Sequence, residues 1–125
     1  MKYLVLLLAM QVLMSDTCKN KEKGGEGTPK AVEAKDLPAC LQQRIDSIRK
    51  EPRWNPPAEV NEYIYKGKQV FLFNSDCCDF FNPLIDNNCQ YICSPSGGIT
   101  GQGDLTCRDF DSLSKHVKLV WRDER

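Results

Sequence analysis

The sequence predicts an α+β domain: a small antiparallel sheet of three to four strands, an N-terminal helix, a short C-terminal helix and disulfide staples. Three observations predict this fold. Apolar residues recur at helical spacing from residue 37, runs rich in β-branched and aromatic residues follow residue 59, and six of the seven cysteines lie between residues 40 and 107. Residues 37–125 are expected to form one domain. A chain this short buries only about 60% of its extended surface, so staples help to stabilise it.

The first element is an amphipathic helix that follows Asp36-Leu37-Pro38, which offers an N-cap oxygen and a proline near the first helical position. Apolar residues then recur at spacings of four, four and three and form one face: Leu37, Leu41, Ile45 and Ile48. Cys40 borders this face, so we expect its sulfur to point toward the sheet. Pro52 ends the helix.

A β-hairpin is predicted over residues 60–74, with strands at 60–65 and 69–74 that flank Lys66-Gly67-Lys68. A two-residue turn and a three-residue turn both fit this segment. They differ by one residue in register, and the sequence leaves the choice open. The second strand is apolar on both faces over residues 70–73, which predicts a central strand covered on both sides.

The C-terminal half predicts a short strand over residues 90–93, a short helix and a final strand. Thr106 and Asp109 have the spacing of a capping box with Asp in place of Glu, and Phe110 and Leu113 follow at helical spacing. The apolar period then changes to two, at Val117, Leu119 and Trp121, which favours a strand.

The N-terminus indicates export. The run over residues 3–14 is apolar except for Gln11 and is too short for a membrane span, which takes about 20 residues. Residues 1–17 are therefore predicted to be a signal peptide, Cys18 a lipidation site and residues 19–36 a flexible tether. Ser15-Asp16-Thr17 departs from the usual lipoprotein cleavage box at every position, so a plain secretory signal remains the alternative.

The other cysteines form an even set that we expect to be structural: Cys40, Cys77, Cys78, Cys89, Cys93 and Cys107. Cys93 and Cys107 bracket a glycine-rich loop and make a natural pair, whose closure contributes about 3 kcal/mol. Cys77 and Cys78 are adjacent and are expected to reach different partners. Cys40 would then join one of them and Cys89 the other. The spacing fits neither a zinc site nor a thioredoxin-like motif.

The glycine-rich segment at 94–104 is the most distinctive run. It lacks the Gly-Lys-Ser/Thr of a phosphate-binding loop, so it is either a tight disulfide-closed turn or a binding edge. The hairpin aromatics and a nearby tryptophan are expected to form one contact surface with this loop, and the alternative is that these aromatics are core residues. The candidate binding residues are Gly97, Gly98, Thr100, Gly101, Gly103, Asp104, Tyr63, Tyr65 and Trp54. Aspartates cluster around the loop. We interpret them as turn caps, with a calcium-type site as the alternative.

Several function classes are disfavoured by composition. Residues 37–125 hold eleven basic and twelve acidic side chains, so no nucleic-acid partner is expected. The single histidine, His116, and the absence of a nucleophile motif argue against an enzyme. We therefore expect no catalytic residue, no cofactor and no metal.

A resemblance adds to this interpretation. The motifs Cys77-Cys78-Asp79-Phe80-Phe81, Pro83-Leu84-Ile85-Asp86, the segment 92–104, Cys107-Arg108-Asp109-Phe110 and Leu119-Val120-Trp121 are similar to an uncharacterised family of small exported bacterial domains. The resemblance covers residues 40–125 and implies export and one domain, but no activity. The leading hypothesis is a non-enzymatic binding module, anchored to the membrane by lipid, with an unknown envelope protein or ligand as partner. A calcium or small-anion binder is the second hypothesis, and a protease inhibitor is the third.

Overall fold

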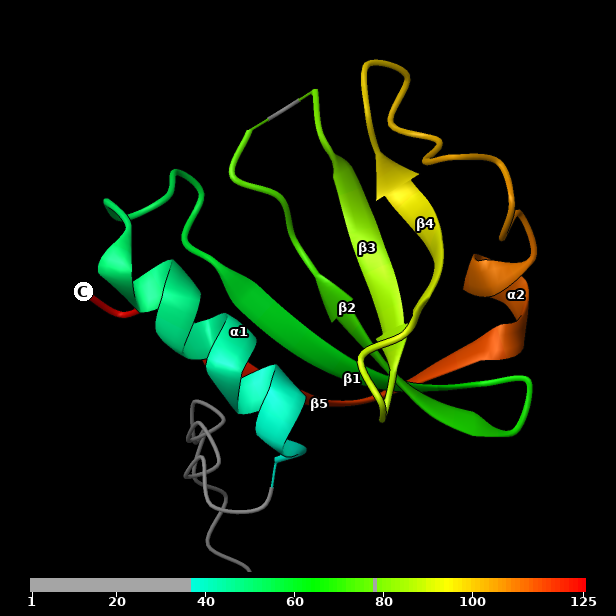
Figure 1. Ribbon diagram of the computed structural model, residues 1–125. Coiled ribbons are helices and arrows are strands. Elements are labelled where there is room, and N and C mark those ends of the chain that lie inside the picture. Colours follow the sequence, from blue (N-terminus) through cyan, green and yellow to red (C-terminus); the bar gives the residue numbers. More distant parts are fainter. Residues whose placement is uncertain (1–36, 78) are drawn as a thin grey trace, which may run out of the picture.

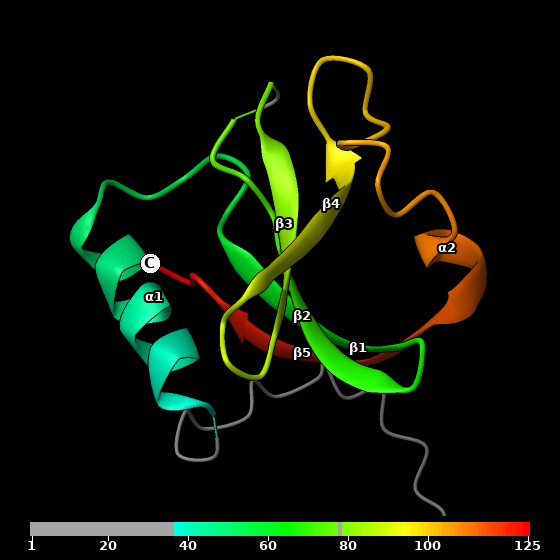
Figure 2. The same ribbon diagram turned by 45° about the vertical axis from the view of Figure 1, so that its right-hand side comes forward.

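A five-stranded antiparallel sheet is the frame of the computed structural model, which describes residues 37–77 and 79–125. The strands lie in the order β4-β3-β2-β1-β5, and the helix α1 packs against one face (Figures 1 and 2). The elements are α1 (Ala39–Lys50), β1 (Glu59–Tyr65), β2 (Lys68–Phe73), β3 (Phe81–Asp86), β4 (Tyr91–Gly97), α2 (Phe110–Leu113) and β5 (Ser114–Arg122). The predicted fold class is confirmed, but the sheet has five strands instead of three to four.

Several predictions concern residues outside this description. The signal peptide, the lipidation of Cys18, the tether, the N-cap at Asp36 and the pairing of Cys78 all fall there. Within the described part, Pro38 takes the cap position of α1 without a side-chain cap bond. No helix in residues 37–77 and 79–125 is long and apolar enough to cross a membrane.

The unexpected strand is β3, which contains Pro83. A proline cannot donate a ladder hydrogen bond, so it argues against a strand except at a bulge or an edge. The structure places Pro83 at such an irregularity, because the register between β3 and β4 shifts between Asn82 and Leu84. Pairing with β2 begins only at Leu84. Proline is therefore accommodated inside an otherwise regular strand.

The hairpin of β1 and β2 closes through a two-residue turn. Tyr65 pairs with Lys68, and Lys66 and Gly67 have φ values of 49° and 76°. This is the turn geometry that matches the twist of antiparallel strands. The register left open by the sequence is thereby decided, and β2 is the central strand, as predicted.

Two apolar cores lie on the two faces of the sheet. On one face, Phe71 and Phe73 of β2 pack with Val60 and with the buried face of α1, formed by Leu41, Ile45 and Ile48. On the other face, Val70, Leu84 and Tyr65 pack with Phe110 and with the Cys93 and Cys107 pair. The side chains of β2 therefore enter both cores, which explains why residues 70–73 are apolar on both faces of the strand.

The strand β5 is confirmed, but its alternation is interrupted. The register against β1 shifts twice, so that Val120 and Val117 each lie between paired positions. Such bulges change which face the following side chains occupy. Val120 and Trp121 are consequently both buried, whereas Val117 is exposed.

The C-terminal tail returns to the end of α1 (Figure 1). The Arg125 guanidinium donates to the carbonyl oxygens of Arg49 and Glu51, at 2.6 and 3.1 Å, and pairs with the buried Asp123 carboxylate. The pKa of Asp123 is lowered to about 2, mainly by the hydrogen bond from Arg125. This arrangement satisfies carbonyl groups that the helix end leaves without intrahelical donors.

Candidate functional site

The disulfides determine how the loops are held. Cys93 of β4 is bonded to Cys107, as predicted, with 6.1 Å between their Cα atoms. Cys40 is bonded to Cys89, so the predicted bond from Cys40 to Cys77 or Cys78 is wrong. The reason is spatial: the first turn of α1 lies beside the turn between β3 and β4, which carries Cys89. Cys77 lies in the exposed connection that follows β2.

The glycine-rich loop folds back along β4. Gly103 donates its N–H to Gly97 O at 3.0 Å, and Asp104 donates to Ser94 O at 2.9 Å. A Cβ on Gly103 would overlap the Ser94 carbonyl oxygen and lie 2.7 Å from the Pro95 carbonyl carbon. Glycine is therefore needed here because two backbone segments are in direct contact.

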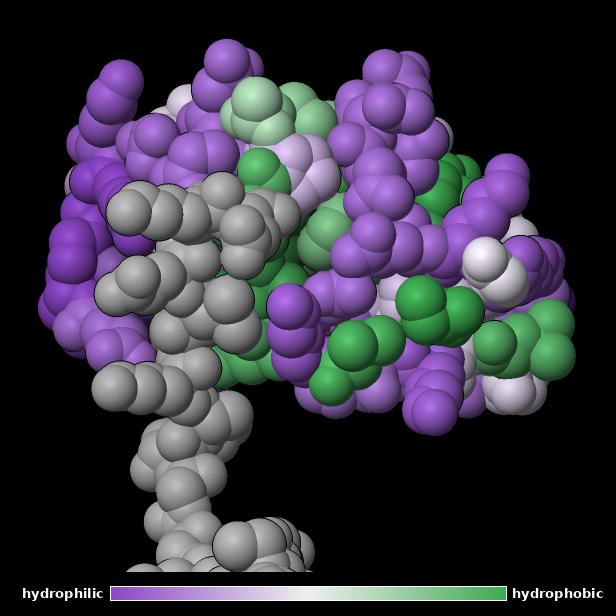
Figure 3. Space-filling model, turned by 90° about the horizontal axis from the view of Figure 1, so that it is seen from below, coloured by the Kyte–Doolittle hydropathy of each residue, from purple (hydrophilic) through white to green (hydrophobic). Residues whose placement is uncertain are grey.

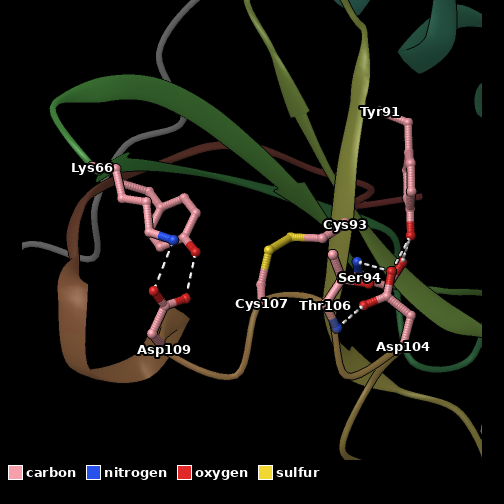
Figure 4. Close-up of a disulfide and its surroundings, with 9 residues drawn as sticks. Lys66, Tyr91, Cys93, Ser94, Asp104, Thr106, Cys107 and Asp109 are labelled. Carbon is pink, nitrogen blue, oxygen red and sulfur yellow. Dashed lines mark hydrogen bonds and ion pairs between the residues drawn. A yellow bond between two sulfur atoms is a disulfide. The ribbon is translucent and has the colours of Figure 1, made fainter.

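The Asp104 carboxylate anchors this loop (Figure 4). It accepts hydrogen bonds from the Ser94 and Thr106 N–H groups, each at 2.9 Å, and from the Tyr91 hydroxyl. Burial by itself would raise the pKa of Asp104, but these hydrogen bonds outweigh it and the pKa is lowered. Asp104 therefore holds the loop together instead of presenting its oxygens to a ligand.

The Asp109 carboxylate forms the second anchor, on the other side of the disulfide (Figure 4). It accepts a hydrogen bond from the Tyr65 hydroxyl at 2.6 Å and pairs with Lys66 Nζ at 2.7 Å, which lowers the pKa of Asp109 through Lys66 first and Tyr65 second. The predicted capping box is wrong. Asp109 holds the cap position of the four-residue α2 without a side-chain cap bond, because its oxygens face the hairpin turn.

One aspartate near the loop, Asp86, has a turn-forming role. Asp86 Oδ1 accepts the N–H groups of Asn88 and Gln90 at 2.8 and 2.9 Å, which is the turn-cap arrangement that we expected. Over the part of the chain that the structure describes, no three acidic, histidine or cysteine side chains gather as metal ligands would.

The predicted aromatic surface is divided between the two faces of the sheet. Tyr65 is only 5% exposed, and both Tyr65 and Tyr63 pack against Phe110, with ring centroids 5.2 and 5.1 Å apart. Trp54 packs against the core on the α1 face. The prediction that these three side chains share one contact surface is therefore wrong.

A surface that the sequence analysis missed lies beside the loop tip. Phe80 and Phe81 are 63% and 50% exposed, and Ile99 is 89% exposed. The Phe81 ring lies against Gly98, where a Cβ would be 2.5 Å from Cε1, and Gly98 N–H donates to Phe80 O at 2.9 Å. We call Phe80, Phe81 and Ile99 the apolar rim. The adjacent phenylalanines of the cysteine motif were the available signal.

A groove connects the apolar rim to Trp54. It has a volume of about 380 Å³ and runs between α1 and the connection from β2 to β3, with a lining that includes Arg44, Trp54, Phe73, Phe80 and Phe81. The Arg44 guanidinium lies 4.5 Å from the centre of the Phe73 ring, and partial desolvation there lowers its pKa, although the residue as a whole is exposed. We call this the aromatic groove. It brings one predicted residue, Trp54, together with the two phenylalanines.

The face seen from below has a different character. There, hydrophobic residues lie in small groups between hydrophilic ones (Figure 3).

The exposed part of the glycine loop is narrower than the sequence suggested. Thr100 and Gly101 are exposed, whereas Gly98 and Gly103 are buried and Gly97 is half-buried. Gly97, Gly98 and Gly103 therefore support close backbone contacts, and the part of the loop that is open to a partner is the stretch 99–102.

Comparison with known proteins gives a family. No curated protein and no solved structure matches the chain. The family model described as "Domain of unknown function (DUF6970)" matches residues 46–123, which is more than half of the chain and includes every strand. The expected membership of an uncharacterised family agrees with this match. The chain therefore belongs to the DUF6970 family of domains of unknown function.

Proposed function

We propose that this protein is a non-enzymatic binding module, exported and held at the cell envelope by a lipid on Cys18. The apolar N-terminal run and the cysteine that follows it support export and lipid anchoring. The bonds Cys40–Cys89 and Cys93–Cys107 support an oxidising compartment. The observation that carries the binding role is the apolar rim, where two exposed phenylalanines and an exposed isoleucine lie on a rigid support.

The support matters because ordering a flexible surface costs binding free energy. Here the loop is tied by the Cys93–Cys107 bond and by the Asp104 carboxylate, and Gly98 lies directly against the Phe81 ring. Aromatic side chains, phenylalanine among them, are enriched at the core of protein–protein interfaces. With half or more of each residue exposed, covering one of these phenylalanines contributes about 1–2 kcal/mol.

Site-specific photo-crosslinking tests the binding role. A photoreactive phenylalanine analogue at Ile99 in the full chain, expressed in its own cells, is expected to give a discrete crosslinked product. The double variant Phe80→Ser, Phe81→Ser is expected to remove it. Leu113 is a matched control, because it is 55% exposed but lies on α2. Equal crosslinking from both positions would contradict the proposal.

The anchor has a separate test. Mass spectrometry of protein from the membrane fraction is expected to find an acyl modification on Cys18, and Cys18→Ala is expected to release the protein from that fraction. Unchanged fractionation of the variant would remove the anchor from the proposal and leave the binding role.

A further inference from the structure

We infer that a second groove, beside the start of α1, binds a small neutral ligand rich in hydroxyl groups, of the saccharide class, through the Glu62 carboxylate. This groove has a volume of about 400 Å³, which lies in the range of small-molecule sites. We call it the Glu62 groove. None of its lining residues belongs to the apolar rim, so the inference goes beyond the proposed function and does not rest on it.

The Glu62 carboxylate is the polar centre of this groove. Glu62 lies on β1, is only 8% exposed and lines the groove. Its Oε1 accepts a hydrogen bond from Gln69 Nε2 at 2.8 Å, whereas Oε2 lies 3.6 Å from Lys118 Nζ, which is too far for a hydrogen bond. Within residues 37–77 and 79–125, no hydrogen bond reaches Oε2. A largely buried acceptor without a donor favours a ligand that supplies one.

The charges of the lining balance, which favours a neutral ligand. Glu62 and Lys118 are its two charged residues, one of each sign. Lys118 would repel an ammonium group, and Glu62 would repel a carboxylate. Gln69 and Asn87 add side-chain amides, which both donate and accept hydrogen bonds. Hydroxyl groups also donate and accept, so they match this lining better than either kind of ion.

The apolar part of the lining fits the same class of ligand. Leu37 and Pro38 are half-buried on one side of the groove, and Phe71 is 1% exposed and lies beneath it. Small-molecule sites typically combine such apolar surface with a few placed polar groups. A saccharide presents C–H groups as well as hydroxyls and can therefore contact both parts of the lining.

A disulfide holds two walls of the Glu62 groove together. The Cys40–Cys89 bond joins the first turn of α1 to the turn between β3 and β4, and these segments lie side by side (Figures 1 and 2). Cys40 follows closely on Pro38, and Cys89 follows closely on Asn87. The two walls are therefore fixed before a ligand arrives, which lowers the entropy cost of binding.

A glycan microarray tests this inference. The full chain is applied to an array that carries neutral, amino and acidic saccharides, and we expect it to bind neutral ones. A bound neutral saccharide is then titrated into the isotope-labelled full chain, where the side-chain amide signals of Gln69 and Asn87 are expected to shift in a saturable way. Glu62→Gln is expected to weaken binding at least tenfold, because it removes the charged acceptor.

The matched control is Glu59→Gln. Glu59 lies on the same strand and also pairs with a basic side chain, Arg122, but it does not line the groove. Its loss is expected to leave saccharide affinity unchanged. Asn87→Ala gives a second test at an exposed position, where weaker binding is expected without loss of the fold. Thermal unfolding of each variant checks that the domain is folded.

Three results would overturn the inference: no saccharide bound on the array, binding of charged saccharides alone, or shifted signals that lie away from the groove. Stronger binding of a simple alkylamine than of any neutral saccharide would assign the groove to a cation and would also overturn it. Crosslinking at Ile99 is independent of all these outcomes, so the proposed function and this inference can fail separately.

Discussion

Replacing Gly103 by alanine should destabilise the domain far more than the same change at Gly101. Both residues have positive φ, 68° and 74°, so both variants are strained in the backbone. At Gly103 the added Cβ would overlap the Ser94 carbonyl oxygen and lie 2.7 and 2.8 Å from two further backbone atoms of Pro95 and Ser96. At Gly101 no atom lies within 4 Å.

The expected magnitudes follow from these two terms. The left-handed conformation costs an L-residue about 1–2 kcal/mol, which applies to both variants. Overlap with rigid backbone adds about 1–3 kcal/mol at Gly103 alone, because the loop can relieve it only by leaving β4. Gly101→Ala should therefore lose about 1–2 kcal/mol of unfolding free energy, and Gly103→Ala about 2–5 kcal/mol.

Equilibrium denaturation in urea, with the disulfides intact, measures this difference as a change in midpoint at constant slope. Hydrogen exchange at the Asp104 N–H, which donates to Ser94 O, should also become faster in Gly103→Ala only. Equal destabilisation by the two variants would show that the loop is not packed against β4 and would refute the reasoning.

Three further predictions concern the staples, the tail and the apolar rim. Replacing Cys93 and Cys107 together by alanine should lower the free energy of unfolding by about 3 kcal/mol, measured by urea denaturation without reductant, since their sequence separation is 14. Asp123 has a folded pKa of about 2, below its unfolded value near 4, so its contribution is complete above about pH 4 and is lost as the pH falls toward 2. In Asp123→Asn, the free energy of unfolding should therefore change less between about pH 4 and pH 2, as measured by urea denaturation at each pH. An unchanged pH dependence in this window would contradict the role given to Asp123. Phe80→Ser with Phe81→Ser should lower the free energy of unfolding by about 1–3 kcal/mol, because half of Phe81 and a smaller part of Phe80 are already covered in the folded domain, and a larger loss would show that they are core residues instead.

Elements defined by local pattern were predictable. The spacing of Leu41, Ile45 and Ile48 predicted the buried face of α1, and the apolar run of β2 predicted its central place. The strand β3 was not predicted, because Pro83 argues against a strand. A proline is tolerated there only because the register against β4 shifts at this point, and no local sequence pattern shows such a shift. The same holds for the bulges of β5, which changed the faces of Val117 and Val120.

The candidate site was less predictable for a related reason. The pair Cys93–Cys107 closes a short loop and could be proposed from spacing, whereas Cys40–Cys89 depends on where α1 lies over the sheet. Tyr65 and Trp54 are both aromatic and close in sequence, yet they contact opposite faces.

Helical and strand periodicity, turn residues and cysteine number act over a few residues, and they were sufficient for the fold class, the helix, the hairpin and the disulfide-bonded character of the domain. Strand count, the second disulfide and the meeting of Phe80, Phe81 and Trp54 along one groove depend on contacts between distant segments. Burial of both faces of β2 decides those contacts, because it places α1 on one side of the sheet and the disulfide-closed loop on the other.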